Sequence, residues 1–252
     1  MTHHKDPELS IVVFAYNEAE NVTAVLRELL QWLRVREPSS EVIFVDDGSG
    51  DGTADEVVRL AGKPPRAAEG ADEVTIPLIL VRHDKNRGIG AALKSGVARA
   101  RGRWVTFLPA DGQIPPEAIG MLRAAQADLV LSVYAHRDDG MHRKILSLGV
   151  RTFIALVHGS FLSSAGPYLF RRSLFIPEEL HSDTFFLNFE FPLRVRSSRL
   201  PTKTVTIPCR PRRRGHSKVA KTKTVALIAR DVLHLRALQA TEWWMRTLGK
   251  AG

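Results

Sequence analysis

LSIVVFAYNE, residues 9–18 of this 252-residue chain, passes from an apolar run to a polar end. Leu9–Ala15 is short, mostly apolar and rich in β-branched residues, which predicts a buried parallel strand. In the next segment, Ala19–Val35, apolar residues recur at helical spacing, and Pro38 ends the pattern. A buried strand, a polar strand end and a helix in this order begin a βαβ unit.

The same alternation continues along the chain. We expect further strands at 41–45, 76–82, 104–108 and 129–134, a helix at 53–60, and a Gly-rich turn that leads into a helix at 86–101. The segment 62–73, rich in Pro, Gly, Ala and charge, is expected to be an insertion. The pattern predicts an α/β fold with a mostly parallel, Rossmann-like sheet flanked by helices.

Acidic residues stand at the polar ends of three expected strands: Glu18, then Asp46 with Asp47, then Asp111. In an open α/β sheet, ligands bind at the carboxyl ends of the strands. We therefore expect these side chains to share one ligand site.

The motif VDDGSGDGT, residues 45–53, combines two carboxylates with a Gly-rich turn. Asp46 and Asp47 could accept hydrogen bonds from a nucleobase or from ribose hydroxyls. In the alternative interpretation these residues only form a turn, and Asp51 or Thr53 caps the next helix.

The motif NRGIGAALKSGVARARG, residues 86–102, matches a dinucleotide-binding fingerprint weakly, because Leu93 occupies the third glycine position. LPADGQIPPE, residues 108–117, offers Asp111 and Gln113 as hard oxygen ligands. Such a pair suits Mg²⁺ or Mn²⁺ bridging to phosphates, and the alternative is an Asp-Gly turn before a helix.

The net charge of +9 is unevenly distributed: residues 191–230 contain twelve Lys and Arg and no Asp or Glu. This asymmetry predicts a polyanionic partner, or else a solvated basic face. Nucleic acid is not expected, because the strand-end carboxylates would repel its phosphates. The sequence has one cysteine, Cys209, no signal peptide and no sufficiently long apolar run, so we expect a cytoplasmic protein.

Five motifs, in this order, resemble family 2 glycosyltransferases, in particular dolichyl-phosphate mannose synthases and bacterial polyprenyl-phosphate glycosyltransferases. They are FAYNEAENV (14–22), VDDGSGDGT (45–53), the segment from NRGIG to ADGQ (86–113) and, more loosely, YLFRRSLF (168–175) and RRRGHSK (212–218). The resemblance implies a GT-A fold and an inverting enzyme. It would move a hexose from GDP-mannose or a UDP-hexose to a polyprenyl or dolichyl phosphate. The alternatives are a family member with a hydroxyl acceptor and a non-catalytic nucleotide-sugar-binding module.

Carried onto this sequence, the resemblance implies a donor site that spans several motifs. The nucleotide pocket would contain Ala15, Tyr16, Glu18, Asp46 and Asp47. Ala110, Asp111 and Gln113 would lie at the metal and diphosphate, and Arg212, Ser217 and Lys218 would face the phosphates. Pro109 replaces the first carboxylate of the family's Asp-x-Asp signature, which weakens the expected affinity for Mg²⁺ or Mn²⁺.

The acceptor decides whether a catalytic base is needed. A lipid phosphate is already anionic near neutral pH, so positioning by cations suffices, and Arg137 and Arg143 are candidate clamps or else solvated loop charges. A hydroxyl acceptor would require a carboxylate base, for which Glu190 is the candidate. In the alternative interpretation, Glu190 pairs with an arginine.

We expect a catalytic domain at 1–220 that includes an amphipathic interface segment at 145–165, followed by an amphipathic helical tail at 221–252. Trp243 and Trp244 in this tail stand beside basic residues, which favours peripheral contact with the inner face of an anionic membrane. The alternatives are packing of the tail on the catalytic domain, a homodimer, or a partner membrane protein.

Overall fold

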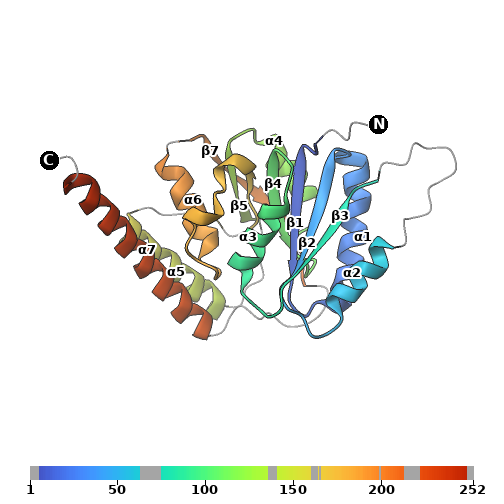
Figure 1. The fold of residues 1–252 in the computed structure, drawn as a ribbon, viewed down its shortest axis with the longest axis horizontal. Helices are drawn as coiled ribbons and strands as arrows, with labels where there is room; N and C mark the ends of the chain where they lie inside the picture. Colours follow the sequence, from blue (N-terminus) through green and yellow to red (C-terminus); the bar gives the residue numbers. More distant parts are fainter. Residues whose placement is uncertain are drawn as a thin grey trace.

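The computed structural model describes residues 6–62, 75–135, 141–159, 164, 166–198, 200–212 and 222–248, and for 141–147, 151, 222–225 and 242–248 it describes the backbone alone. The chain forms an α/β fold around a seven-stranded sheet with the order β3-β2-β1-β4-β6-β5-β7 (Figure 1). The strands are β1 Leu9–Ala15, β2 Ser40–Asp46, β3 Leu78–Arg82, β4 Trp104–Pro109, β5 Leu129–Tyr134, β6 Leu169–Arg171 and β7 Thr202–Ile207. The predicted fold class is confirmed.

Strand direction follows the βαβ pattern of the first half of the chain. β1 pairs in parallel with β2 and β4, β2 with β3, and β5 with β7. β6 is antiparallel to both of its neighbours, β4 and β5. Three residues are too few to show a period in sequence, so β6 was not predicted.

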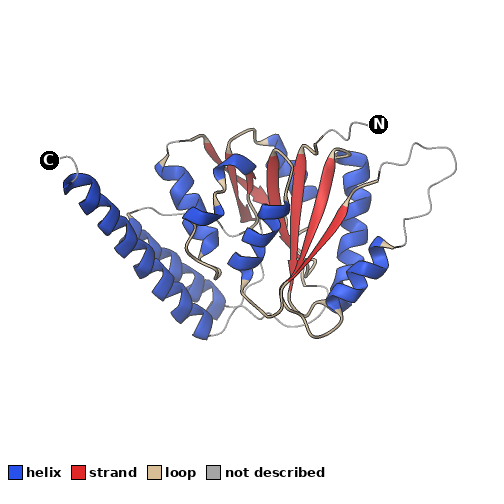
Figure 2. Ribbon diagram, in the orientation of Figure 1, coloured by secondary structure: helices blue, strands red, loops and turns tan. Residues whose placement is uncertain are grey.

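Helices cover both faces of the sheet (Figure 2). They are α1 Ala19–Arg36, α2 Thr53–Ala61, α3 Ile89–Arg99, α4 Glu117–Ala124, α5 Met141–His158, α6 Leu187–Ser197 and α7 Thr222–Leu248. Along β1, Ile11 and Val13 belong to a core shared with α1, α2 and α4, whereas Val12 and Phe14 belong to a core shared with α3, α5, α6 and α7. This alternation is the two-residue period of a strand buried on both faces.

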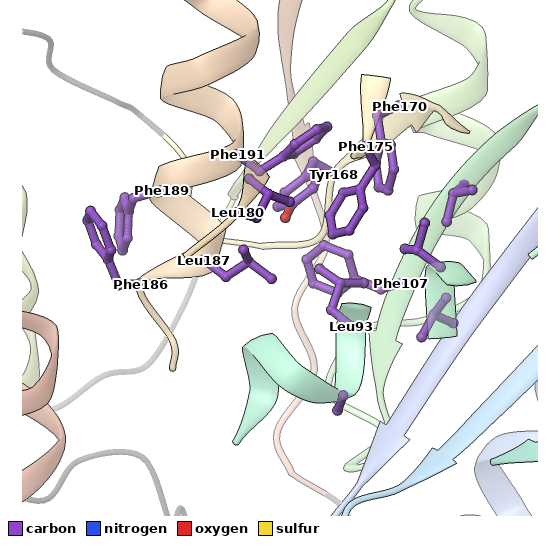
Figure 3. Packing of buried hydrophobic residues seen from close by; sticks show 14 of the residues in the cluster. Leu93, Phe107, Tyr168, Phe170, Phe175, Leu180, Phe186, Leu187, Phe189 and Phe191 are labelled. Carbon is purple, nitrogen blue, oxygen red and sulfur yellow. The ribbon is translucent and has the colours of Figure 1, made fainter. Parts of the chain in front are cut away.

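Aromatic rings fill the second core where α6 meets β4 and β6 (Figure 3). Tyr168 packs edge-on against Phe107 at a centroid distance of 4.7 Å, and Phe191 packs against Phe170 at 4.8 Å. Tyr168 is fully buried, and this burial raises the pKa of its hydroxyl above the ordinary value. These contacts anchor α6 and therefore fix the position of Glu190, which α6 carries.

α5 and α7 pack side by side and extend away from the sheet (Figure 1). α5 begins four residues before the expected interface segment, and α7 lies within the expected helical tail at 221–252. Ile228, Val232 and Leu235 of α7 are buried in the same core as the strands, so α7 packs against the rest of the fold. No helix in the described ranges is both long and apolar enough to cross a membrane.

Candidate functional site

Three buried carboxylates lie at the carboxyl ends of neighbouring strands. Glu18 follows β1, Asp46 ends β2 and Asp111 follows β4, and their exposed fractions are 9%, 1% and 9%. The register pairs Ala15 with Asp46. The structure therefore brings together the acidic positions that the strand-end rule selected, at the edge where open α/β sheets bind ligands.

Hydrogen bonds connect the turns that follow β1 and β2 at the carboxyl ends of these strands. The backbone N–H of Asn17 donates to Ser49 Oγ over 2.9 Å, and the N–H of Gly50 donates to Asn17 Oδ1 over 2.9 Å. Asp46 Oδ1 accepts the N–H of Ser49 at 3.1 Å. Tyr16, which directly follows β1, exposes 37% of its surface.

Asp51 has the structural role that the alternative interpretation gave to Asp51 or Thr53. Asp51 Oδ1 accepts the backbone N–H of Thr53, the first residue of α2, and Asp51 Oδ2 accepts the N–H of Ala19, the first residue of α1. Although partial burial raises the pKa of Asp51, hydrogen bonds from Thr53 and Ala19 outweigh this effect and leave the pKa below 3.8. Asp51 therefore accepts one N-terminal N–H group from each of two helices.

Arg212 joins two of the three carboxylates. Its Nη2 lies 2.7 Å from Glu18 Oε1 and 3.4 Å from Asp111 Oδ2. The segment that carries Arg212 is held in place by Arg210, whose N–H donates to the carbonyl of Gln113 over 2.7 Å and whose side chain pairs with Glu28 of α1. The cationic C-terminal part of the chain thus reaches the acidic strand ends.

The predicted metal pair offers one carboxylate. Asp111 Oδ1 accepts the N–H of Gln113 at 3.1 Å, and Gly112 between them has a φ of +72°. Within the described ranges, the Gln113 carboxamide forms no side-chain hydrogen bond, and no group of three or more His, Cys, Asp and Glu could hold a metal ion. A carboxylate and a carboxamide are oxygen ligands that Mg²⁺ accepts when substrate phosphates and water complete its shell, and the assignment of Asp111 and Gln113 to a metal ion stays a prediction. Ala110 is 1% exposed and lies in the core.

Asp47 is engaged differently from Asp46. Its carboxylate accepts the backbone N–H groups of Arg87 and Gly88, each at 2.9 Å, and lies 2.7 Å from His83 Nδ1. Sequence reasoning missed His83, which directly follows β3 as Asp47 directly follows β2. That common position after a strand was the available signal.

Glu190 is 3% exposed and holds a loop. Its Oε1 accepts the N–H of His181 at 2.7 Å and lies 3.1 Å from His181 Nδ1, and its Oε2 accepts the N–H of Ser182 at 2.8 Å. No arginine of the described segments pairs with it. Both carboxylate oxygens are therefore used within the protein.

The remaining predicted residues cannot be placed in the site. Arg137, Ser217 and Lys218 lie outside the described residues, and Arg143 lies in the part of α5 described by its backbone alone. Their assignment to the acceptor and the phosphates stays a prediction.

Comparison with known proteins identifies similar sequences and folds. The sequence model described as glycosyl transferase family 2 matches residues 10–190. A dolichyl-phosphate beta-glucosyltransferase of Trichomonas vaginalis is 31% identical over 182 residues, which cover 65% of this chain and 53% of that protein. An undecaprenyl-phosphate 4-deoxy-4-formamido-L-arabinose transferase of Yersinia enterocolitica is 27% identical over 230 residues, which cover 89% of this chain and 66% of that protein.

The chain thus spans between half and two thirds of the length of these curated relatives. Among solved structures, glucosyl-3-phosphoglycerate synthase of Mycobacterium tuberculosis, in complex with Mn²⁺, UDP and glucosyl-3-phosphoglycerate, has a TM-score of 0.59 at 18% identity. The match covers 90% of this chain and 77% of the synthase. At 18% identity, this similarity shows a common fold and nothing further.

Proposed function

Because the chain belongs to glycosyl transferase family 2, we propose that it transfers a hexose from a nucleoside-diphosphate sugar to the phosphate of a polyprenyl lipid, with inversion at the anomeric carbon. The contact of Arg212 with both Glu18 and Asp111 is the observation that carries the proposal. It places a cation at the carboxyl ends of β1 and β4, where a donor diphosphate would lie. GDP-mannose and UDP-hexoses are the proposed donors.

The nucleoside end of the donor is assigned to Ala15, Tyr16 and Asp46. Asp46 is 1% exposed, and among the described residues its side chain accepts a hydrogen bond through Oδ1 alone. Its Oδ2 can accept a hydrogen bond from a base or a ribose hydroxyl. Tyr16 supplies an exposed ring against which a planar base can stack.

The diphosphate end is assigned to Asp111, Gln113 and Arg212. As the bond between the anomeric carbon and the donor phosphate breaks, its electron pair leaves with the nucleoside diphosphate, and negative charge grows on that group. The fixed guanidinium of Arg212 stabilises this charge in the transition state more than in the ground state. Mg²⁺ or Mn²⁺ held by Asp111 and Gln113 would supply further Lewis-acid stabilisation of the phosphates.

The acceptor needs no base in this proposal. An anionic oxygen of the lipid phosphate forms the new bond to the anomeric carbon, opposite the bond that breaks. Because this oxygen carries no proton to remove, the full use of both Glu190 oxygens in loop contacts is compatible with turnover. The relatives' names refer to dolichyl-phosphate and undecaprenyl-phosphate, which favours this acceptor class over a sugar hydroxyl.

Access to a lipid acceptor is assigned to α5 and α7. Leu148 and Leu156 of α5 expose 60% and 80% of their surfaces, and Leu233 of α7 exposes 56%. Exposed leucines on a helix pair, in a chain whose residues 191–230 include twelve Lys and Arg, favour peripheral contact with an anionic membrane surface.

The test is an incubation with radiolabelled UDP-glucose or GDP-mannose, each with polyprenyl phosphate, followed by extraction into organic solvent. The proposal expects label in the organic phase with one donor. Donor binding without any labelled product would instead support a non-catalytic nucleotide-sugar-binding module. Label transferred to a water-soluble hydroxyl acceptor in place of the lipid would support the other family activity.

A further inference from the structure

The loop after β3, residues 84–88, lies directly against the turn after β2. The N–H of His83 donates to the carbonyl of Asp46 over 2.9 Å. A Cβ added to Gly48 would lie 2.3 Å from the carbonyl carbon of Lys85, so the two backbones touch at a glycine whose φ is +71°. The loop is therefore a wall of the same strand-end site that contains Asp46.

Asp47 fixes this loop through its backbone. Oδ1 accepts the N–H of Arg87 and Oδ2 accepts the N–H of Gly88, each over 2.9 Å. On the other side of the loop, a Cβ at Gly88 would lie 2.7 Å from the carbonyl oxygen of Asp183. The loop is thus held between the carboxylate of Asp47 and the segment before α6.

His83 in turn orients Asp47. Its Nδ1 lies 2.7 Å from Asp47 Oδ1, its Nε2 lies 2.9 Å from Ser95 Oγ of α3, and its side chain is 4% exposed. With the proton on Nδ1, the ring donates to Asp47 and accepts from the Ser95 hydroxyl, which satisfies both nitrogens. The Asp47 carboxylate also accepts the backbone N–H groups of Arg87 and Gly88. The hydrogen-bonded Asp47, His83 and Ser95 therefore position the loop that contains these two residues.

The side chain of Arg87 is exposed, and it forms no hydrogen bond or ion pair with the described residues. It lies beyond β2 from the diphosphate residues, because the sheet order runs β3-β2-β1-β4 and Asp111 follows β4. Neighbouring strands are about 4.8 Å apart, so β3 lies roughly 14 Å from β4. A donor that places its diphosphate at Asp111 would extend its nucleoside toward Asp46 and this loop.

We propose that Asp47 and His83 are positioning residues for donor binding, which hold the loop 84–88 so that Arg87 donates to oxygen atoms of the nucleoside. Asp47 acts through Arg87 and makes no contact with the nucleotide. This inference rests on the proposed function, and it adds the loop 84–88 to the proposed donor site.

A double-mutant cycle tests this relationship. UDP and GDP are titrated calorimetrically into the wild type, Asp47→Asn, Arg87→Ala and the double variant. We expect each single substitution to weaken the affinity for the preferred nucleotide about tenfold, and the double variant to bind no more weakly than Arg87→Ala. In turnover assays the donor KM should rise while kcat stays within a few-fold of the wild type.

Arg103→Ala is the matched control, because Arg103 is an exposed arginine immediately before β4, at the amino ends of the strands and away from the proposed site. It should leave nucleotide affinity unchanged. Thermal unfolding without nucleotide checks folding, and His83→Gln replaces Asp47→Asn if that variant does not fold. Effects of Asp47→Asn and Arg87→Ala that multiply in the double variant would overturn the inference, because Asp47 would then act independently of Arg87.

Failure of the inference and failure of the proposed function give different results. A wild-type protein that binds neither UDP nor GDP would refute the proposed function and the inference with it. A wild-type protein that binds one of them, with an Arg87→Ala variant of equal affinity, would refute the inference alone.

Discussion

The guanidinium of Arg212 donates a 2.7 Å hydrogen bond to the carboxylate of Glu18, although 194 positions separate them in the sequence. Glu18 ends the first βα turn, directly before α1, whereas Arg212 follows the last strand. The contact brings the positive C-terminal part of the chain to the carboxylates at the sheet edge. It therefore connects the net charge of the protein with its proposed chemistry.

Substitution Arg212→Ala should lower turnover of the labelled donor by at least about a hundredfold, because it removes the cation that we propose stabilises the leaving diphosphate. Arg212→Lys should retain part of the activity, since it keeps the charge. Arg210→Ala is the control, because it keeps the backbone N–H that binds the carbonyl of Gln113 and holds this segment in place. Loss of its partly exposed ion pair with Glu28 should cost no more than about 1 kcal/mol of stability and leave kcat unchanged. Equal losses in the 210 and 212 variants would argue against a specific role for Arg212.

Substitution Asp111→Asn should remove the effect of divalent ions on donor binding. The wild type should show a larger thermal shift with UDP or GDP in Mn²⁺ than in chelator, because the ion joins the nucleotide to the protein and raises its apparent stability. In the Asp111→Asn variant the two shifts should be equal. A metal-dependent shift that survives the substitution would place the ion elsewhere.

Substitution Glu190→Gln should lower stability by about 1–3 kcal/mol, because an amide nitrogen would face a backbone N–H that a carboxylate oxygen now accepts. Turnover per folded molecule should stay within a few-fold of the wild type. Chemical denaturation and initial-rate assays on the same preparation measure the two effects. Normal stability and normal donor binding with no turnover would instead identify Glu190 as the base for a hydroxyl acceptor.

Substitution Leu156→Asp should reduce co-sedimentation with vesicles of phosphatidylcholine and phosphatidylglycerol by about tenfold or more, because it places a charge where an exposed leucine would enter the lipid surface. Thermal stability should not change, since the residue is 80% exposed. Val58→Asp on α2 is the control, because Val58 is also apolar and 57% exposed. Equal vesicle binding by the wild type, Leu156→Asp and Val58→Asp would contradict the assignment of α5 as a lipid contact.

Local sequence patterns predicted those helices and strands in which the apolar residues form a continuous run or recur at a clear spacing. β1, β2, β4 and β5 lie within two residues of their expected bounds, since each combines an apolar run with a polar end. α6 was missed because Leu187, Phe189, Phe191 and other residues are buried all around it, so no helical stripe is visible, and it contains Pro192. β7 was missed because four of its six residues are Thr or Lys at the edge of the sheet.

The sequence likewise predicted some features of the site and not others. The strand-end rule was sufficient to select Glu18, Asp46 and Asp111 together, because it depends only on where strands stop. It could not separate Asp46 from Asp47, since the N–H groups that occupy Asp47 come from a loop about 40 positions further along the chain. The role of Glu190 was equally hidden, because backbone N–H partners leave no mark in a sequence.

Label transfer to polyprenyl phosphate, compared with transfer to the same polyprenol without its phosphate, tests the central claim most directly. The account predicts organic-extractable product with the phosphate alone, formed by the wild type and largely lost in Arg212→Ala. Product formed equally well from the free alcohol, or formed at an unchanged rate by Arg212→Ala, would contradict it.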